Sequence, residues 1–322
     1  MEDLLNLEPT SISRDLKGKF LLVYGEAKVG KTTFAAHFPK PLLFAFEHGY
    51  NAISGIHAID MFSWSDFKKY ARQLKDEAVK EKFSTIIIDT IGIAVDLCEK
   101  YILAQNGVDK LSDIAWGGGW AQYRKEFENT FRELSQLGYA IVFIAHSKVK
   151  PSGFKNSQGE DIDSYYPDVN KTGFNAVNRL VDIIGYLSVE FQADGSSKRW
   201  FYSRQTPYIF AGTRYRYMAP KIPFGYNELV DAISDAIEKE AQEGAQVTDS
   251  MTPIIVPRPF GEAQAEAKEL WTKLTSNNNE ANTLIIQESI MRIFGQKLKL
   301  SQVTENQLEL LELVIEDMKK MV

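Results

Sequence analysis

Short apolar runs alternate with amphipathic stretches over the first two thirds of the chain. The apolar runs have the length and composition of buried strands, and they lie within residues 19–24, 42–47, 83–89 and 139–145. The stretches between them carry helical patterns, at about residues 32–38, 65–79, 92–104 and 119–137. This alternation predicts an α/β fold in which parallel strands are covered by helices on both faces.

The pattern changes after about residue 180. Two β-rich runs, 182–191 and 199–203, flank a polar segment that contains Asp194-Gly195, a dipeptide typical of hairpin turns. We therefore expect the mostly parallel sheet to end in antiparallel strands. A helical stretch at 226–243 completes the predicted core, which we place at residues 1–243.

The C-terminal part of the chain reads as a separate helical region. Residues 244–260 are polar and then proline-rich, which is typical of a linker. Residues 261–322 have helical periodicity and include a capping box that begins at Thr304. One apolar stripe favours a small helical core over a coiled coil, and it consists of Leu308, Leu311, Ile315, Met318 and Val322.

Composition narrows the class of protein. The chain has 322 residues, 44% of them hydrophobic, and no apolar run approaches the roughly 20 residues that span a bilayer. Its acidic N-terminus lacks the basic start of a signal peptide, and its single cysteine, Cys98, fits a reducing compartment. We expect a cytoplasmic protein without a membrane partner. The net charge of −6 argues against a surface coated in positive charge, but it allows a local basic groove.

Residues 25–32 read Gly-Glu-Ala-Lys-Val-Gly-Lys-Thr and fill every defining position of the G-x-x-x-x-G-K-[ST] phosphate-binding loop. In such a loop the backbone N–H groups surround the phosphates, Lys31 reaches the β and γ oxygens, and the Thr32 hydroxyl ligates Mg²⁺. An apolar run precedes the loop and a helical stretch follows it, as the motif requires. The predicted nucleotide-binding residues are Gly25, Glu26, Ala27, Lys28, Val29, Gly30, Lys31, Thr32 and Thr33.

Polar side chains follow the other predicted strands. Asp89 comes after three consecutive isoleucines and is the candidate carboxylate partner of Mg²⁺. Glu47 could orient or deprotonate an attacking water, although its position also suits a solvated turn residue. His146 could contact the γ-phosphate, or it could be an ordinary hydrogen-bonded residue at a strand end.

This order of motifs resembles the RecA-type ATPase core. The likeness rests on the loop at 25–32, the Glu47-His48 pair, Asp89 and His146, and it covers about residues 15–240. It is closest to phage nucleotide-binding proteins of that class, including single-strand annealing proteins with a minimal RecA-like core. The resemblance implies that Glu47 polarises water, that Asp89 is associated with Mg²⁺, and that His146 occupies the place of a polar sensor, commonly a glutamine.

The resemblance also implies two DNA-facing segments, one after Asp89 and one after His146. The first offers aromatic and basic side chains that could stack on bases and contact phosphates, namely Trp116, Trp120 and Arg124. Inward-packed tryptophans in a flexible loop are equally compatible with it. The second segment, residues 147–172, carries Lys148, Lys150 and Lys155, but acidic residues bring its net charge near zero.

Residues 198–221 hold basic and aromatic side chains and no acid. They could form a nucleic-acid track, or they could supply an arginine finger to the γ-phosphate of a neighbouring subunit. Arg214 is our first candidate for that finger and Arg204 the second. Outward charges on an edge hairpin are the alternative.

The sequence thus leads to a functional hypothesis. We expect a Mg·ATP-hydrolysing protein, with Glu47, Lys31, His146 and Arg214 as catalytic residues and Thr32 and Asp89 as metal ligands. It would assemble on single-stranded DNA as a ring or filament with ATP between subunits, in phage recombination, annealing or replication in the bacterial host cytoplasm. The C-terminal region would bind a partner such as a single-strand binding protein. A helicase-type motor and a nucleotide-gated switch that does not bind nucleic acid are the alternatives.

Overall fold

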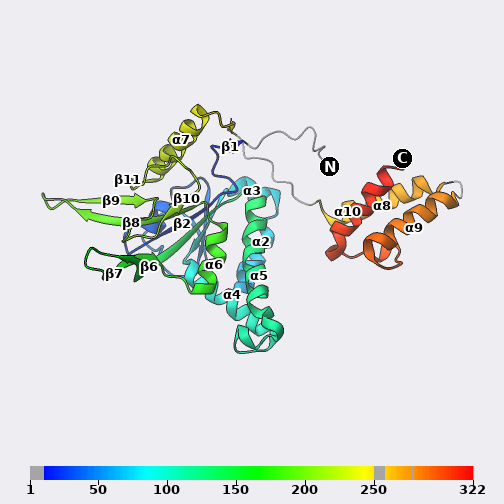
Figure 1. Ribbon diagram of the computed structural model, residues 1–322, viewed down its shortest axis with the longest axis horizontal. Coiled ribbons are helices and arrows are strands. Elements are labelled where there is room, and N and C mark those ends of the chain that lie inside the picture. The colour runs from blue at the N-terminus through cyan, green and yellow to red at the C-terminus, as the bar shows by residue number, and fades with distance from the viewer. Residues whose placement is uncertain (1–10, 250–257, 277–278, 322) are drawn as a thin grey trace. The chain divides into compact units, whose positions relative to one another are not determined.

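The computed structural model describes residues 11–249, 258–276 and 279–321 (Figure 1). The chain divides into two compact units, Met1–Ile254 and Ile255–Val322, and each has its own hydrophobic core. None of the helices in these described ranges combines the length and the hydropathy that a membrane span requires.

A ten-stranded sheet, counted over the described residues, forms the centre of the larger unit. Its parallel part has the spatial order β4-β3-β5-β6-β2-β8. These strands are β2 (Phe20–Gly25), β3 (Pro41–Ala45), β4 (His57–Asp60), β5 (Thr85–Asp89), β6 (Ala140–Lys155) and β8 (Ile183–Phe191). Beyond β8 the sheet continues in antiparallel strands, which are β9 (Ser197–Tyr202), β10 (Gly212–Thr213) and β11 (Lys221–Pro223). The predicted α/β class, with a mostly parallel sheet that ends in antiparallel strands, is confirmed.

Side chains alternate along β2 and enter two cores, one on each face of the sheet. Leu22 and Tyr24 enter the larger core, whereas Leu21 and Val23 enter the smaller one. The larger core is covered by α2 (Trp64–Gln73), α4 (Ile91–Asn106), α5 (Gly118–Gln136) and α6 (Lys171–Leu180). The smaller core is covered by α1 (Lys31–Ala35) and α7 (Tyr226–Gln242). Both faces are therefore shielded from water, as the continuous apolar strands require.

Several elements differ from the prediction. The helix expected at 32–38 ends at Ala35, because the backbone N–H groups of His37 and Phe38 form tighter i→i−3 hydrogen bonds to Phe34 and Ala35. The helix expected at 65–79 is two helices: α2 ends at Gln73, and the Asp76 side chain then caps α3 (Glu77–Lys82) by accepting from the Ala78 N–H at 2.9 Å. Strand β4 and helix α6 were not predicted.

The segment expected to be a DNA-facing loop at 147–172 is mostly a β-hairpin. Strand β6 continues past the parallel sheet and turns back as β7 (Asp161–Pro167), with Ser147 opposite Pro167 and Lys155 opposite Asp161. Helix α6 then begins at Lys171, where the Asn170 side chain caps its N-terminus. The prediction missed the hairpin because its outer strands are polar and therefore lack the apolar pattern of the core strands.

The predicted hairpin after residue 182 is confirmed, since β8 pairs antiparallel with β9. In the sheet register, Gly25 at the end of β2 lies opposite His146 of β6 on one side and Leu187 of β8 on the other. Both neighbouring strands continue beyond these positions, and Figure 1 shows the two hairpins projecting from the same side of the sheet. The loop after Gly25 therefore lies between the two hairpins.

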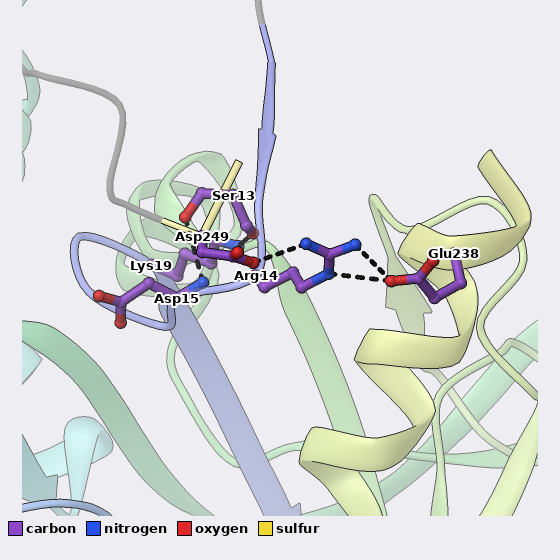
Figure 2. Close-up of polar contacts among 6 residues, drawn as sticks. All are labelled: Ser13, Arg14, Asp15, Lys19, Glu238 and Asp249. Atoms are coloured by element: carbon purple, nitrogen blue, oxygen red, sulfur yellow. Dashed lines mark hydrogen bonds and ion pairs between the residues drawn. The ribbon is translucent and has the colours of Figure 1, made fainter. Parts of the chain in front are cut away.

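A small parallel pair, β1 (Ile12–Ser13) with β12 (Val247–Thr248), holds the start of the described chain against the segment after α7. Arg14 reinforces this pair, because its guanidinium donates to Asp249 at 2.6 Å and to Glu238 of α7 (Figure 2). The linker predicted at 244–260 is thus partly structured, and the larger unit extends beyond residue 243. Residues 250–257 of that predicted linker lie outside the described residues.

The smaller unit consists of α8 (Phe260–Leu274), α9 (Glu280–Phe294) and α10 (Leu308–Lys319) around its own core. Leu311, Ile315 and Met318 of the predicted stripe are buried there, and Leu308 packs against them. Val322 lies outside the described residues. The capping box at Thr304 is present, although it starts a short 3₁₀ turn before α10.

A glycine in β8 tests the packing between the sheet and its hairpin. A Cβ at Gly185 would lie 1.9 Å from the Phe201 ring, which is 1% exposed. We expect Gly185→Ala to lower the free energy of unfolding by about 2–3 kcal/mol through overpacking, measured by urea denaturation.

The matched control is Gly212→Ala, in the strand that pairs with β8. A Cβ there would meet no atom of the described residues within 4 Å, so a change within about 0.5 kcal/mol is expected. Equal effects of the two substitutions would contradict the packing described for Gly185.

Candidate active site

The loop at residues 25–32 joins the end of β2 to the start of α1, and its backbone conformation requires glycine at two positions. Gly30 has φ 103°, which favours glycine, and it precedes the first residue of the helix. A Cβ at Gly25 would lie 2.7 Å from the carbonyl oxygen of Leu187. These positions let the chain curl into the concavity in which backbone N–H groups bind anions.

Lys31 lies inside this loop. Its side chain is buried, and its ammonium donates to the carbonyl oxygens of Gly25 at 3.0 Å and Glu26 at 2.6 Å. Burial lowers the pKa of Lys31, while the nearby carboxylates of Asp89, Glu47 and Glu26 oppose that shift. The lysine is therefore held at the loop by its own backbone, with its charge directed to where phosphates would bind.

The two predicted metal ligands are in direct contact. The Thr32 hydroxyl donates to the Asp89 carboxylate at 2.6 Å, and Asp89 is only 6% exposed. Burial raises the pKa of Asp89, and the hydrogen bond from Thr32 partly offsets this rise. Desolvation thus makes a bare carboxylate unfavourable here, and a bound cation would relieve it.

The donor set fits a magnesium ion bound together with a nucleotide. Among the described residues, no group of three or more His, Cys, Asp or Glu side chains could hold a metal ion alone. Mg²⁺ commonly takes one or two protein oxygens and completes its shell with phosphate oxygens and water. Thr32 and Asp89 supply such a partial set beside the loop.

Glu47 lies next to Asp89, two residues beyond β3. Its backbone N–H donates to the Asp89 carbonyl oxygen at 3.0 Å, which fixes the turn. One oxygen of its carboxylate lies 2.9 Å from Nε2 of His146, and both side chains are about half exposed. His48, by contrast, is turned toward β4, where its Nδ1 lies 3.1 Å from the carboxylate of Asp60.

The structure therefore brings Lys31, Thr32, Asp89, Glu47 and His146 to one edge of the sheet. The strand order explains this, because β6 lies between β2, which leads into the loop, and β5, which carries Asp89. Parallel strands present their carboxyl ends at the same edge. His146, opposite Gly25, is the last residue of β6 in the parallel sheet.

The two arginines chosen as finger candidates lie elsewhere. Arg214 pairs with Asp182 at 2.8 Å, and Asp182 also accepts the N–H of Phe20, at the opposite end of β2 from the loop. Arg204 donates to the carbonyl oxygens of Tyr215 and Arg216. Neither arginine therefore adjoins the loop of its own chain, and a finger role for Arg214 remains a prediction that involves a second subunit.

Sequence reasoning missed an arginine that does adjoin the loop. A terminal nitrogen of Arg199 lies 3.0 Å from the position of a Cβ on Gly30. Alternation along β9 offered a partial signal, because Arg199 must share a face with the buried Phe201. That this face meets the loop follows only from the tertiary fold.

The first group of predicted DNA-binding residues surrounds the turn between α4 and α5. Trp116 is fully exposed, Trp120 is 44% exposed, and Arg124 is exposed on α5. This turn follows the far end of α4, which begins two residues after Asp89 and whose 16 residues span about 24 Å. The inward-packed alternative is therefore wrong for Trp116.

The second group lies on the β6–β7 hairpin. Lys148 pairs with Asp168 at 3.3 Å, and Lys155 pairs with Asp161 at 3.3 Å. Lys150 lies 3.7 Å from the centre of the Tyr166 ring and has no carboxylate partner among the described residues. Two of the three lysines are thus partly neutralised.

This strand order, with a phosphate loop and the buried Asp89 carboxylate at its edge, defines a RecA-like P-loop ATPase. The chain belongs to the AAA_24 family, an AAA domain, which matches residues 17–215. This family of P-loop ATPases implies nucleotide binding, usually with Mg²⁺.

Two further similarities were found. The chain is 27% identical over 330 residues to the SPbeta prophage-derived uncharacterized protein YorG of Bacillus subtilis (strain 168), covering 98% of each sequence. It is also similar to the crystal structure of the flagellar accessory protein FlaH from Methanocaldococcus jannaschii, at 11% identity and a TM-score of 0.34. That similarity covers 65% of this chain and 85% of FlaH.

Because Asp89 is buried, we expect its substitution to have opposite effects on stability and on activity. Because its pKa is raised in the folded protein, its ionised form opposes folding at neutral pH. We expect Asp89→Asn, which keeps an acceptor for Thr32, to raise the melting temperature of the nucleotide-free protein at pH 7.5 by about 2–4 °C and to abolish Mg²⁺-dependent hydrolysis.

This gain in melting temperature should disappear below the ordinary pKa of an aspartate, about 3.9, because Asp89 of the wild type is then protonated in both the folded and the unfolded state. Asp109→Asn, at an exposed position, is the control and should change neither property. A lower melting temperature for Asp89→Asn at pH 7.5 would contradict the desolvation argument.

Proposed function

We propose that the protein hydrolyses Mg·ATP at this site and that the bound nucleotide controls its affinity for single-stranded DNA. The observation that carries the proposal is His146, which contacts Glu47 through its side chain and the β6–β7 hairpin through its backbone. The prophage-derived relative supports a link to phages, and we place the proposed activity in phage recombination, annealing or replication. The host cytoplasm would be the setting.

The chemistry follows from the side chains at the sheet edge. Lys31 and the loop amides would bind the phosphates, and Thr32 and Asp89 would hold Mg²⁺, which would supply positive charge to the transferred phosphoryl group. Glu47 is exposed enough to orient or deprotonate a water, and His146 holds one of its carboxylate oxygens. Glu47 therefore has one oxygen fixed and the other available for the water.

Coupling to DNA runs through one backbone position. The His146 carbonyl oxygen accepts the Asp168 N–H at 2.7 Å, and Asp168 pairs in turn with Lys148. A change in the Glu47–His146 contact when nucleotide binds would therefore shift the base of the hairpin. The hairpin presents Lys150 and two exposed apolar side chains, Val149 and Phe154, to an incoming strand.

Exposed aromatic and cationic groups support single-stranded DNA as the ligand, because bases stack on aromatic rings and phosphates bind cations. Trp116, Trp120 and Arg124, which follows Trp120 by four residues on α5, offer a second set of exposed groups of this kind. Assembly as a ring or filament would place Arg214 at the ATP of a neighbouring subunit. The C-terminal unit would remain available for a single-strand binding protein.

The pairing of Lys148 and Lys155 with acids favours a second candidate, a nucleotide-gated switch that does not bind nucleic acid. Fluorescence anisotropy of labelled single-stranded DNA, with and without Mg·ATP and over a range of salt, separates the two. DNA assembly predicts binding that requires Mg·ATP and weakens with salt. A flat trace would support the switch, and unwinding of a forked duplex would indicate a helicase-type motor.

The coupling role of His146 gives a specific prediction. We expect His146→Ala to bind Mg·ATP nearly as well as the wild type but to lose most of the stimulation of turnover by DNA, by about 10-fold or more. Coupled ATPase assays with and without single-stranded DNA measure both quantities.

Lys31→Ala is the reference for a lost phosphate site and should abolish nucleotide binding and turnover. Equal DNA stimulation in His146→Ala and the wild type would contradict the coupling route. Normal turnover in Lys31→Ala would contradict the assignment of the active site.

A further inference from the structure

Arg199 lies on the opposite side of the phosphate loop from Glu47 and His146. Strand β2 has β6 on one side, which carries His146, and β8 on the other, which pairs with β9 and so brings Arg199 to the loop. Val189, opposite Arg199, lies two residues beyond the position that faces Gly25. The arginine is thus carried past the sheet edge, beside the loop.

The guanidinium is held in place without neutralising its charge. It lies 5.9 Å from the centre of the Phe224 ring, and Phe224 stacks on Phe34 of α1 at 5.2 Å. The backbone also fixes this position, because the Phe224 N–H donates to the Arg199 carbonyl oxygen at 3.1 Å. Within the part of the chain that the structure describes, its side chain forms no hydrogen bond or ion pair.

This makes Arg199 different from the other arginines near the sheet. Arg204 and Arg214 are occupied by carbonyl or carboxylate groups. Arg199 instead presents a charged, exposed group at Gly30, whose left-handed conformation belongs to the anion-binding curl of the loop. A guanidinium in such a place is suited to phosphate oxygens, which accept two parallel N–H donors.

We propose that Arg199 binds the phosphate chain of the nucleotide in its own subunit, from the β8–β9 side of the loop. This inference rests on the nucleotide-binding part of the proposed function and is independent of DNA. Since Arg199 belongs to a hairpin, its contact also ties that hairpin to the bound nucleotide. The loop then lies between the Glu47–His146 pair on one side and Arg199 on the other.

The test measures the affinity of the full chain for Mg·ATP and for inorganic tripolyphosphate, by competition against a fluorescent ATP analogue. We expect Arg199→Ala to lower the affinity for both ligands by about 10-fold or more, the range for a lost charge-assisted hydrogen bond. Arg199→Lys should recover part of this loss. The change should appear in KM more than in kcat.

Lys198→Ala is the matched control, because Lys198 is the preceding residue on the opposite face of β9 and is exposed. It should leave both affinities within about twofold of the wild type. The proposal would be overturned if Arg199→Ala bound tripolyphosphate as tightly as the wild type does. This holds even if its affinity for ATP falls, since Arg199 would then contact the base or the ribose. If the wild type itself bound neither ligand, the proposed function would fail first.

A mixing experiment tests whether Arg199 acts within its own subunit. Arg199→Ala retains the phosphate loop but lacks the arginine, whereas Lys31→Ala retains the arginine but lacks a working loop. If Arg199 acts within its own subunit, the ATPase rate of a mixture of the two variants should not exceed the sum of the rates of the two variants measured separately. Restored turnover in the mixture would show that Arg199 serves a neighbouring subunit and would overturn the assignment.

Discussion

The position of β6 in the sheet is the constraint on which the site depends. Because β6 pairs with β2 on one side and β5 on the other, the phosphate loop, Asp89 and His146 meet at one edge. The same strand continues outward as the first strand of a hairpin. His146 and the projecting hairpin are therefore parts of one continuous strand.

The second organising feature is the burial of charge at that edge. Lys31 and Asp89 are both 6% exposed, and their pKa values move in the directions that desolvation dictates, downward for the ammonium and upward for the carboxylate. In the nucleotide-free protein, desolvation therefore disfavours the charged form of each group. A polyanion and a divalent cation would complete the charge balance together, which links the two ligands without any direct contact between Lys31 and Asp89.

The hydrophobic cores position the site through residues that are not themselves part of it. Leu22 and Val23, buried on opposite faces of β2, hold the strand within the sheet. Substitutions at the edge can therefore alter chemistry while the cores remain intact. The helical unit, described over residues 258–276 and 279–321, has a separate core.

Local patterns in the sequence were enough to predict the class of fold, the phosphate loop and a carboxylate at Asp89 beside it, because buried strands and a glycine-rich loop have characteristic compositions. It did not reveal the β6–β7 hairpin or the break between α2 and α3, since polar strands and capping residues carry weak periodic signals. The sequence does not single out Arg199 within residues 198–221, because nothing local distinguishes the arginines of that basic segment. That Arg199 adjoins Gly30 and that Arg214 pairs with Asp182 at the other end of β2 follows from the folded structure alone, because strand order and register fix which distant residues meet.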